Sequence, residues 1–269
     1  MLGRWLGVAV AAPSLVVGGL LAGSLLTSGG GSGAVAGAGR AAHRAGVRAE
    51  LRSAAVRDVP AAGSVVVANV LGPRALVFRA PTARRPWRRY SNPTPQRTPL
   101  VFLVRARRGS WLRVMLPSRP NGSEGWLRTA GVELRCDPYS VRVDLSARRL
   151  VVRAARRIVL DVAVGVGRAA TPTPSGLYYV AELLRQPDPH GLYGPWAFAL
   201  SAHSRVLSHF GGGDGQVGIH GTDEPSGIGH TVSHGCIRVS NRSIERLAAM
   251  LPLGTPVTIV GDATQFTRT

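Results

Sequence analysis

The sequence predicts a protein made mostly of β-structure, with one short helix. Short runs that alternate apolar and polar residues recur between Ser64 and Val260, and glycine or proline separates many of them. This pattern is typical of strands joined by turns. The segment from Asn241 to Met250 instead has apolar residues at helical spacing. Hydrophobic residues make up 45% of the 269-residue chain, which is enough to bury a core in one or two domains.

Residues 1–27 are predicted to be a signal peptide or a membrane anchor. No charged residue occurs between Arg4 and Arg40, and the 21 residues from Leu6 to Leu26 are mostly Leu, Val, Ala and Gly. At about 1.5 Å per residue, a helix of this length just spans a bilayer. A small-x-small site at 34–36 would allow cleavage of a signal peptide, whereas the length of the apolar segment favours a retained anchor. In either case the rest of the chain is expected to be exported.

Residues 28–62 are predicted to be a linker. They are rich in Gly, Ala and Arg, and a transient helix over 41–56 would have no clear apolar face. A flexible tether of this kind lets a domain reach away from a membrane. At the other end of the chain, residues 262–269 follow the last strand-like run and are assigned to a C-terminal tail.

Residues 63–135 are predicted to form a small β-barrel. The stretch 81–99, with five prolines and five arginines, is expected to be a long loop between strands. The run 109–114 followed by 125–128 resembles the second half of bacterial SH3-like domains. The strand-like runs have the spacing of a small barrel or sandwich and lie at Ser64–Leu71, Ala75–Arg79, Leu100–Arg107, Trp111–Leu116, Gly125–Arg128 and Val132–Leu134.

Residues 138–261 are predicted to form a second β domain that contains the helix. Ser240 or Asn241 can cap the helix at its start, and Pro252 stops it. Alternation predicts strands at Ser140–Leu145, Leu150–Arg153, Ile158–Val166, Leu177–Leu183, Ala197–Ser201, Arg205–Val206, Gln216–His220 and Thr255–Val260.

The run 233–238, which reads Ser-His-Gly-Cys-Ile-Arg, carries the most chemical information. A cysteine is nucleophilic as a thiolate and needs a nearby base or positive charge to become one at neutral pH. His220, 16 residues before Cys236 at the end of a predicted strand, is the candidate base. Gly235 has no side chain to block a substrate, and amide N–H groups nearby can stabilise an oxyanion. Ser233 and Gly235 are therefore the candidate oxyanion loop.

These residues resemble the catalytic signature of the L,D-transpeptidase (YkuD-type) family. That signature is a His followed by Ser/Thr-His-Gly-Cys, and the resemblance extends over roughly Pro138 to Gly261. It implies an L,D-transpeptidase-like β-sandwich with one short helix for this domain, preceded by the SH3-like barrel and the N-terminal hydrophobic helix. The matching segments are His220-Gly221-Thr222, Pro225–Gly229, 233–238, the Thr-Pro-x-Gly segment Thr173–Gly176 and the active-site rim Tyr193–Trp196.

The resemblance implies a role for each residue of the signature. Cys236 would be the nucleophile and His220 the general base. The backbone carbonyl of Gly221 is expected to orient His220, in place of the Asp or Asn of other triads. His234 is expected to support the loop. The residues alone leave alternatives, because a free Cys is commonly a small buried hydrophobe and a His can be a hydrogen-bonded core residue.

Arg238, Tyr193 and Trp196 are predicted to bind substrate. The guanidinium of Arg238 has a fork geometry that matches a carboxylate, although some members of the family carry Asn at this position. The alternative for Arg238 is a structural salt bridge. Tyr193 and Trp196 belong to the segment that resembles the active-site rim of the family.

A metal site is a rival interpretation of the same cluster. No compact spacing such as Cys-x-x-Cys or His-Glu-x-x-His is present, so we expect no metal and no other cofactor. The second cysteine, Cys136, is expected to be unpaired and partly buried, because a permanent bond to Cys236 would inactivate the enzyme. The side chains that could supply zinc ligands are those of His203, His209, His220, His230, His234 and Cys236.

The resemblance implies a two-step acyl transfer on peptidoglycan stem peptides. A thioester would form with release of D-Ala, and the amine of a second stem would resolve it into a 3→3 cross-link. Water as acceptor would make the protein an L,D-carboxypeptidase, and an inactive wall-binding protein is a further alternative. The expected location is extracytoplasmic, in the cell wall, with the chain either membrane-anchored through residues 1–27 or secreted.

The net charge of +19 comes from arginine alone, since the chain has no lysine. Such a surface suits an anionic partner, and an acidic cell-wall polymer is the one expected here. The arginines are scattered, and no RNA-binding or helix-turn-helix signature is present. A nucleic-acid partner is therefore not expected.

Overall fold

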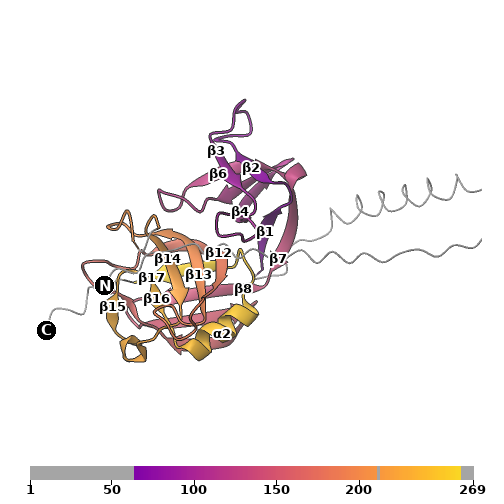
Figure 1. The fold of residues 1–269 in the computed structure, drawn as a ribbon. Coiled ribbons are helices and arrows are strands. Elements are labelled where there is room, and N and C mark those ends of the chain that lie inside the picture. The colour runs from indigo at the N-terminus through magenta and orange to yellow at the C-terminus, as the bar shows by residue number, and fades with distance from the viewer. Residues whose placement is uncertain (1–63, 211–212, 262–269) are drawn as a thin grey trace, which may run out of the picture. The chain divides into compact units, whose positions relative to one another are not determined.

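The structure is a computed structural model that describes residues 64–210 and 213–261. The predicted apolar segment 1–27, the linker 28–62 and the tail 262–269 lie outside the described residues. Within the described ranges the protein is mostly β with one α-helix, as the sequence predicts (Figure 1). No helix of this described part is long and apolar enough to cross a membrane.

The N-terminal β region, residues 64–137, contains a five-stranded sheet in the order β6-β5-β4-β1-β7. Neighbouring strands pair antiparallel throughout, and each predicted strand appears with shifts of a few residues at its ends. A separate antiparallel pair is formed by β2 and β3. The strands are β1 (Val65–Val70), β2 (Arg74–Val77), β3 (Arg88–Ser91), β4 (Val101–Arg108), β5 (Trp111–Met115), β6 (Glu124–Arg128) and β7 (Val132–Asp137).

Strand β3 corrects the prediction of an uninterrupted loop over 81–99. Its side chains alternate between half-buried and exposed positions. Tyr90 packs edge-on against Phe102 at a ring separation of 5.6 Å. The four residues of β3 are two arginines, a tyrosine and a serine, so the strand lacks the aliphatic alternation that reveals a strand in sequence.

The C-terminal β region, residues 138–261, is built on one curled eight-stranded sheet, in the order β10-β9-β8-β17-β12-β13-β14-β16. Strand β12 pairs with β17 on one side and β13 on the other, so it links the two halves. The strands are β8 (Tyr139–Asp144), β9 (Arg149–Ala154), β10 (Arg157–Ala163), β11 (Val166–Gly167), β12 (Gly176–Arg185), β13 (Trp196–His203), β14 (Gln216–His220), β15 (Thr231–Ser233), β16 (Ile237–Arg238) and β17 (Pro256–Val260).

Three details of this sheet differ from the sequence prediction. The predicted strand 158–166 is divided into β10 and β11, and β11 pairs with β15 outside the main sheet. The predicted strand Arg205–Val206 is a bend in a loop. Strands β15 and β16 have only three and two residues, too short for an alternating pattern to be visible.

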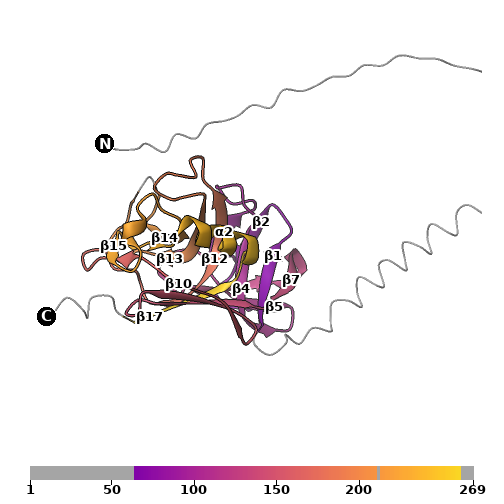
Figure 2. The same cartoon turned by 90° about the horizontal axis from the view of Figure 1, so that it is seen from below.

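Helix α2 (Asn241–Met250) closes the core of the C-terminal β region and lies over β13 and β14 (Figure 2). Ser240 caps it, because its side chain accepts a hydrogen bond from the Ser243 amide. Ile244 and Leu247 are fully buried in the same cluster as the sheet residues. Each such side chain contributes roughly 1.5–3 kcal/mol of hydrophobic stabilisation, so the helix is held directly behind the reactive strands β14 and β16.

A shared buried cluster joins the two β regions. Val67, Leu103 and Met115 of the N-terminal β region pack with Tyr179 and Ala181 of β12. The Tyr179 hydroxyl also donates to the backbone carbonyl of Val101 at 3.3 Å. Packing of this kind makes the N-terminal β region continuous with the core of its neighbour.

Cys136 lies on β7, the edge strand next to β1. It is free, as predicted, but it is exposed rather than partly buried. The flanking Asp137 is the residue whose side chain turns inward and is fully buried, and successive side chains of a strand point to opposite faces.

Candidate active site

Parallel pairing of β14 and β16 brings the two halves of the signature together. The register sets Ile219 opposite Ile237 and His220 opposite Arg238. Cys236 therefore stands just before β16, beside Gly218. Both isoleucines are buried in the core, so burial fixes this register. The 16-residue separation in sequence becomes a contact between neighbouring strands.

The Ser233 side chain holds the turn that presents the thiol. Its hydroxyl donates to the Cys236 carbonyl at 2.5 Å and accepts from the Gly235 amide at 3.1 Å. Gly235 has φ +119°, a conformation that residues with a side chain rarely adopt. Ser233 and Gly235, the predicted oxyanion loop, thus both lie in the turn that leads into Cys236.

Two threonines with no role predicted from the sequence brace the same turn from the far side. The Thr171 hydroxyl donates to the Ser233 carbonyl at 3.2 Å, and the Thr173 hydroxyl donates to the Gly235 carbonyl at 2.9 Å. Thr173 also accepts from the Gly167 amide. The Thr-Pro-x-Gly segment is thus a support for the turn, a function that only the fold reveals.

His220 is buried and held in one tautomer. Its side chain lies in a position only 4% exposed, and Nδ1 lies 2.6 Å from the Gly221 carbonyl. A carbonyl can only accept, so Nδ1 carries the hydrogen and Nε2 is left with a lone pair. Burial lowers the pKa of His220 to about 4, against a smaller raising effect of the Gly221 carbonyl. The ring is therefore neutral at neutral pH and able to accept a proton.

Two backbone contacts fix the chain around Gly221. The Asn241 side chain at the start of α2 accepts from the Thr222 amide at 2.8 Å. A side chain at Gly194 would collide with Asn241 and with the Gly221 backbone, so the rim segment approaches this turn closely. The adjacent Tyr193 ring meets the His220 ring edge-on at 4.8 Å. The carbonyl that orients His220 is consequently held by a helix start and by the rim.

The Cys236 thiol is partly buried and protonated in its resting state. The Gly218 amide donates to its sulfur at 3.4 Å. Burial raises the pKa of the thiol, and this effect exceeds the lowering by the Gly218 amide and the Arg238 charge. In the described part of the chain no hydrogen bond joins the sulfur to His220. The pair therefore rests as a neutral thiol and a neutral imidazole rather than as an ion pair.

His234 differs from His220 in exposure and in its partners. Its side chain is exposed, lies in contact with the Arg168 guanidinium and stacks on Phe210 at a ring separation of 5.2 Å. Partial burial, followed by the neighbouring charges of Arg168 and Arg238, lowers its pKa. The supporting role of His234 stays a prediction.

Arg238 is mostly buried and paired. Its side chain is 11% exposed, and Nη1 lies 3.0 Å from the carboxylate of Glu224. Its Nε is buried without a partner in the described residues. This ion pair is the structural alternative that the sequence left open, and its Glu224 side chain is 63% exposed. Trp196 reaches the site through its backbone, because its carbonyl accepts from the Gly221 amide at 3.4 Å.

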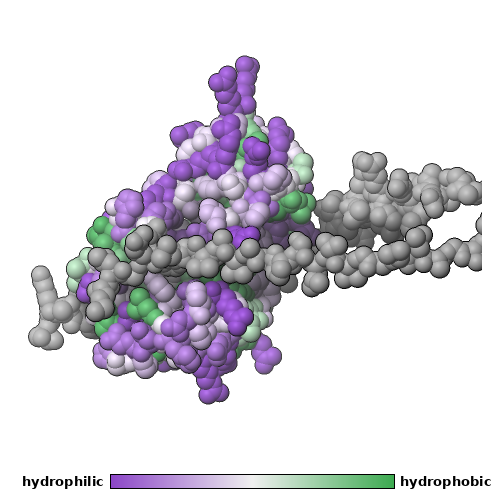
Figure 3. All heavy atoms as spheres, viewed as in Figure 1, coloured by the Kyte–Doolittle hydropathy of each residue, from purple (hydrophilic) through white to green (hydrophobic). Residues whose placement is uncertain are grey.

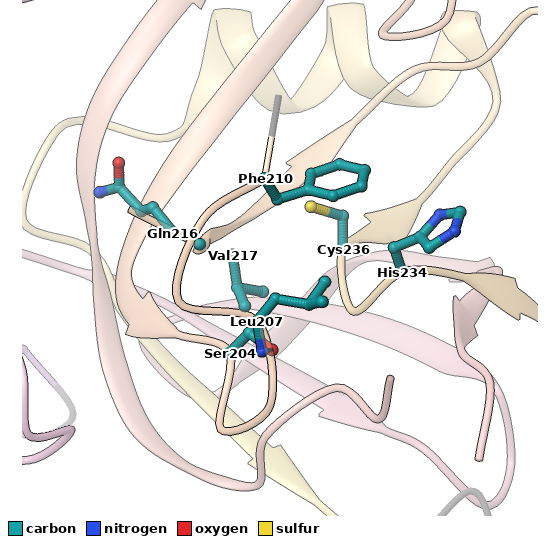
Figure 4. A pocket seen from close by; sticks show the side chains of 8 residues that line it. Ser204, Leu207, Phe210, Gln216, Val217, His234 and Cys236 are labelled. Atoms are coloured by element: carbon teal, nitrogen blue, oxygen red, sulfur yellow. Dashed lines mark hydrogen bonds between the residues drawn. The ribbon is translucent and has the colours of Figure 1, made fainter. Parts of the chain in front are cut away.

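A small pocket opens beside the thiol (Figure 4). The Phe210 ring extends over Cys236 toward His234, and Leu207 and Val217 line the other side. Ser204, Gly215 and Gln216 complete the lining. No sequence motif pointed to these residues. Gln216 and Val217 begin strand β14. The others come from the preceding loop, which has no motif of its own.

Within residues 64–210 and 213–261, no group of three or more His, Cys, Asp or Glu side chains is placed to hold a metal ion. Five of the six candidate ligands named from the sequence make other side-chain contacts. His203, for example, ends β13 and pairs with Asp214 at 3.0 Å.

Residues 138–259 match the family of L,D-transpeptidase catalytic domains known as YkuD. The chain thus carries an L,D-transpeptidase catalytic domain. The match covers the strands, the helix and both histidines described above, and members of this family are cysteine-dependent acyltransferases. The N-terminal β region lies outside the match.

Two curated relatives agree with this assignment. The YkuD proteins of Bacillus licheniformis and Bacillus subtilis, whose names place them among the L,D-transpeptidases, are 38% and 36% identical over 122 residues. That alignment covers 45% of this chain and 66% of each relative, so the chain spans about two thirds of their length. Among solved structures, an L,D-transpeptidase from Mycobacterium smegmatis aligns with TM-score 0.38 and 16% identity over 60% of this chain and 90% of that one.

Proposed function

We propose that this protein is an L,D-transpeptidase that joins peptidoglycan stem peptides through a thioester on Cys236. The observation that carries the proposal is the orientation of His220, whose Nδ1 hydrogen is committed to the Gly221 carbonyl. That bond leaves Nε2 as the proton acceptor on the strand next to the thiol. A neutral base beside a neutral thiol suits proton transfer during attack, rather than a preformed thiolate.

The first step is acylation. The Cys236 sulfur attacks the carbonyl between the L-centre of the third stem residue and D-Ala, and His220 takes the thiol proton. The carbon–nitrogen bond to D-Ala then breaks, and His220 returns the proton to the leaving amine. The Gly235 amide is committed to Ser233, whereas the Cys236 amide has no acceptor among the described residues. The Cys236 amide is therefore the proposed oxyanion donor.

The second step depends on the acceptor. The amine of another stem attacks the thioester, the carbon–sulfur bond breaks, and a 3→3 cross-link forms while Cys236 recovers its proton through His220. Water as acceptor would instead release a tripeptide, as in an L,D-carboxypeptidase. Arg238, Tyr193 and Trp196 are proposed to bind the donor stem, with Arg238 exchanging Glu224 for a substrate carboxylate.

The N-terminal β region is proposed to bring the enzyme to an anionic cell-wall polymer. Residues 64–137 contain 14 arginines and three acidic residues, and no acidic residue occurs between Val59 and Ser123. The tip above β3 is strongly hydrophilic (Figure 3). An excess of like charge attracts a polyanion at long range. This region is proposed to be an SH3-like domain, with residues 1–27 as the signal or anchor that places the enzyme outside the membrane.

The test is to incubate the full chain with disaccharide-tetrapeptide and follow the products by mass spectrometry. The proposal expects loss of D-Ala together with a cross-linked dimer. Release of D-Ala with tripeptide as the sole product would assign the carboxypeptidase. Binding to isolated wall without any D-Ala release would show that the protein is an inactive wall-binding module.

A further inference from the structure

One side chain of the N-terminal β region reaches into the loop beside the active site. We call residues 204–210 and 213–215 the pocket loop. Arg119, between β5 and β6, donates to three of its carbonyls, those of Ser204 at 2.6 Å, Leu207 at 2.8 Å and Asp214 at 2.9 Å. These carbonyls come from both limbs of the loop, so one guanidinium ties the limbs together.

Neighbouring residues support the segment that carries Arg119. The Arg88 guanidinium donates to the Arg119 carbonyl at 2.9 Å, and the Tyr90 hydroxyl forms a hydrogen bond with the Ser118 hydroxyl. Strand β3 thus holds the segment that carries Arg119. Beside it, the Asn121 amide group forms two 2.8 Å hydrogen bonds with the backbone N–H and carbonyl of His203, where β13 runs into the pocket loop.

The pocket loop is closely packed around this guanidinium. Gly215 has φ +77°, and a Cβ there would lie 2.1 Å from the Leu207 carbonyl oxygen. The Ser204 amide donates to the Gly215 carbonyl at 2.8 Å and closes the base of the loop. Converging carbonyl oxygens repel one another unless a donor lies among them, and the planar, multiply donating guanidinium of Arg119 serves all three.

The other face of the pocket loop lines the active site. Ser204, Leu207, Phe210 and Gly215 lie along the pocket that contains the Cys236 thiol (Figure 4). The Phe210 ring stacks on His234 with an interplanar angle of 28°. A displacement of the loop would therefore move the aromatic wall that a donor peptide meets when it approaches the thiol.

We propose that Arg119 is a positioning residue for the transpeptidase reaction, and that the N-terminal β region completes one wall of the active site through it. The proposal rests on the proposed function, because the wall matters only if a peptide enters this pocket. Arg119 touches no reacting atom. It acts through the pocket loop on Leu207 and Phe210.

The test compares Arg119→Lys and Arg119→Ala with the wild-type full chain. Arg108→Ala is the matched control, since it removes the same charge from the same β region at a residue with no contact to the pocket loop. Three quantities are measured: kcat/KM with disaccharide-tetrapeptide, alkylation of Cys236 by iodoacetamide, and the rate of trypsin cleavage after the exposed Arg205. Iodoacetamide is small and uncharged, so it reports access to the thiol without needing the pocket wall.

The proposal expects Arg119→Ala to lower kcat/KM by about tenfold to a hundredfold while alkylation is unchanged or faster. Cleavage after Arg205 should rise by about tenfold, since local opening of the loop governs it. Arg119→Lys should give values between those of the wild type and Arg119→Ala, because an ammonium group lacks the fork geometry with which the guanidinium reaches all three carbonyls. Arg108→Ala should match the wild type in all three.

Turnover and alkylation that fall together would overturn the proposal and show a role in general stability. A kcat/KM of Arg119→Ala equal to that of Arg108→Ala would overturn the proposal as well. Should Arg119→Ala fail to fold, Arg119→Lys and Asn121→Ala carry the same comparison. If the wild type releases no D-Ala, the proposed function fails, whereas cleavage after Arg205 and alkylation still test whether Arg119 holds the loop.

Discussion

The two histidines near Cys236 have different surroundings, which we call the buried wall at His220 and the exposed wall at His234. His220 is buried in the C-terminal β region and is fixed by the Gly221 carbonyl from the same region. His234 is exposed and stacks on Phe210 of the pocket loop, and Arg119 of the N-terminal β region holds that loop. One wall is built entirely within the domain that carries the chemistry. The other depends on a second region of the chain.

This difference separates two tasks. Proton transfer needs a single tautomer and a fixed ring, which burial and a short hydrogen bond provide for His220. Admitting a peptide needs a surface that can adapt, and an exposed aromatic pair on a loop provides one. Changes in the buried wall should therefore affect the chemical step, and changes in the exposed wall should mainly affect the use of large substrates.

The largest effect is expected from Cys236→Ala. This variant should release no D-Ala and form no covalent adduct with a carbapenem, because no other group can form the thioester. Intact-protein mass spectrometry reads out the adduct, and product analysis reads out D-Ala. Cys136→Ala is the control and should retain nearly full activity, since Cys136 is a free cysteine on an edge strand away from the site. Normal activity in Cys236→Ala would refute the thioester mechanism.

The comparison of the two walls is tested by changing each histidine in turn. His220→Gln should lower kcat by about 100- to 10,000-fold, the usual loss of a general base. His234→Gln should cost much less and act mainly on KM, because its ring faces the pocket and not the proton acceptor. Steady-state kinetics with tetrapeptide distinguishes the two. The roles are reversed if His234→Gln proves the more damaging change.

The buried wall also sets the pH dependence. Because burial lowers the pKa of His220 to about 4, kcat/KM should stay high through mildly acidic pH and fall only near pH 4, as His220 becomes protonated. The lowered pKa of His220 also affects folding stability. Between about pH 6.5 and 4, His220 binds a proton in the unfolded chain but not in the folded protein. The free energy of unfolding should therefore fall by roughly 3 kcal/mol as the pH is lowered through that window. An acid limb near pH 6.5 would show that His220 is not buried in solution.

The smallest effect is expected at Arg238. Arg238→Lys should lower turnover of tetrapeptide while alkylation of Cys236 by a small neutral reagent is almost unchanged, because Lys cannot reproduce a bidentate contact with a carboxylate. Glu224→Gln is the matched variant, since it removes the partner that the structure gives Arg238. It should leave turnover intact or raise it by freeing the guanidinium. Equal losses of turnover, alkylation and thermal stability in both variants would leave Arg238 as a brace only.

Much of the fold could be predicted from sequence where local patterns are strong. Strand β14 and helix α2 appear at the predicted residues, with Ser240 as the cap. Strand β3 was missed because arginine dominates it, and β15 and β16 are too short to show a period. Such strands exist because neighbouring strands supply their hydrogen bonds, which a single sequence does not show.

The candidate site divides in the same way. The contiguous motif and the preceding His predict the Cys236–His220 pair, and the structure adds the register that places the two residues on neighbouring segments. Thr171, Phe210 and Arg119 escaped notice, because each acts through a contact between segments far apart in the chain. Every residue has a backbone carbonyl, so residue identity alone does not show which carbonyls a side chain such as Arg119 will contact.

Trapping the acyl-enzyme is the decisive experiment on the thioester mechanism. The full chain is mixed with disaccharide-tetrapeptide, quenched in acid within the first turnover and examined by intact-protein and peptide mass spectrometry. We expect a mass increase equal to the donor minus D-Ala, carried on Cys236, sensitive to hydroxylamine and absent in Cys236→Ala. D-Ala released without any adduct on Cys236, or an adduct mapped to another residue, would contradict it.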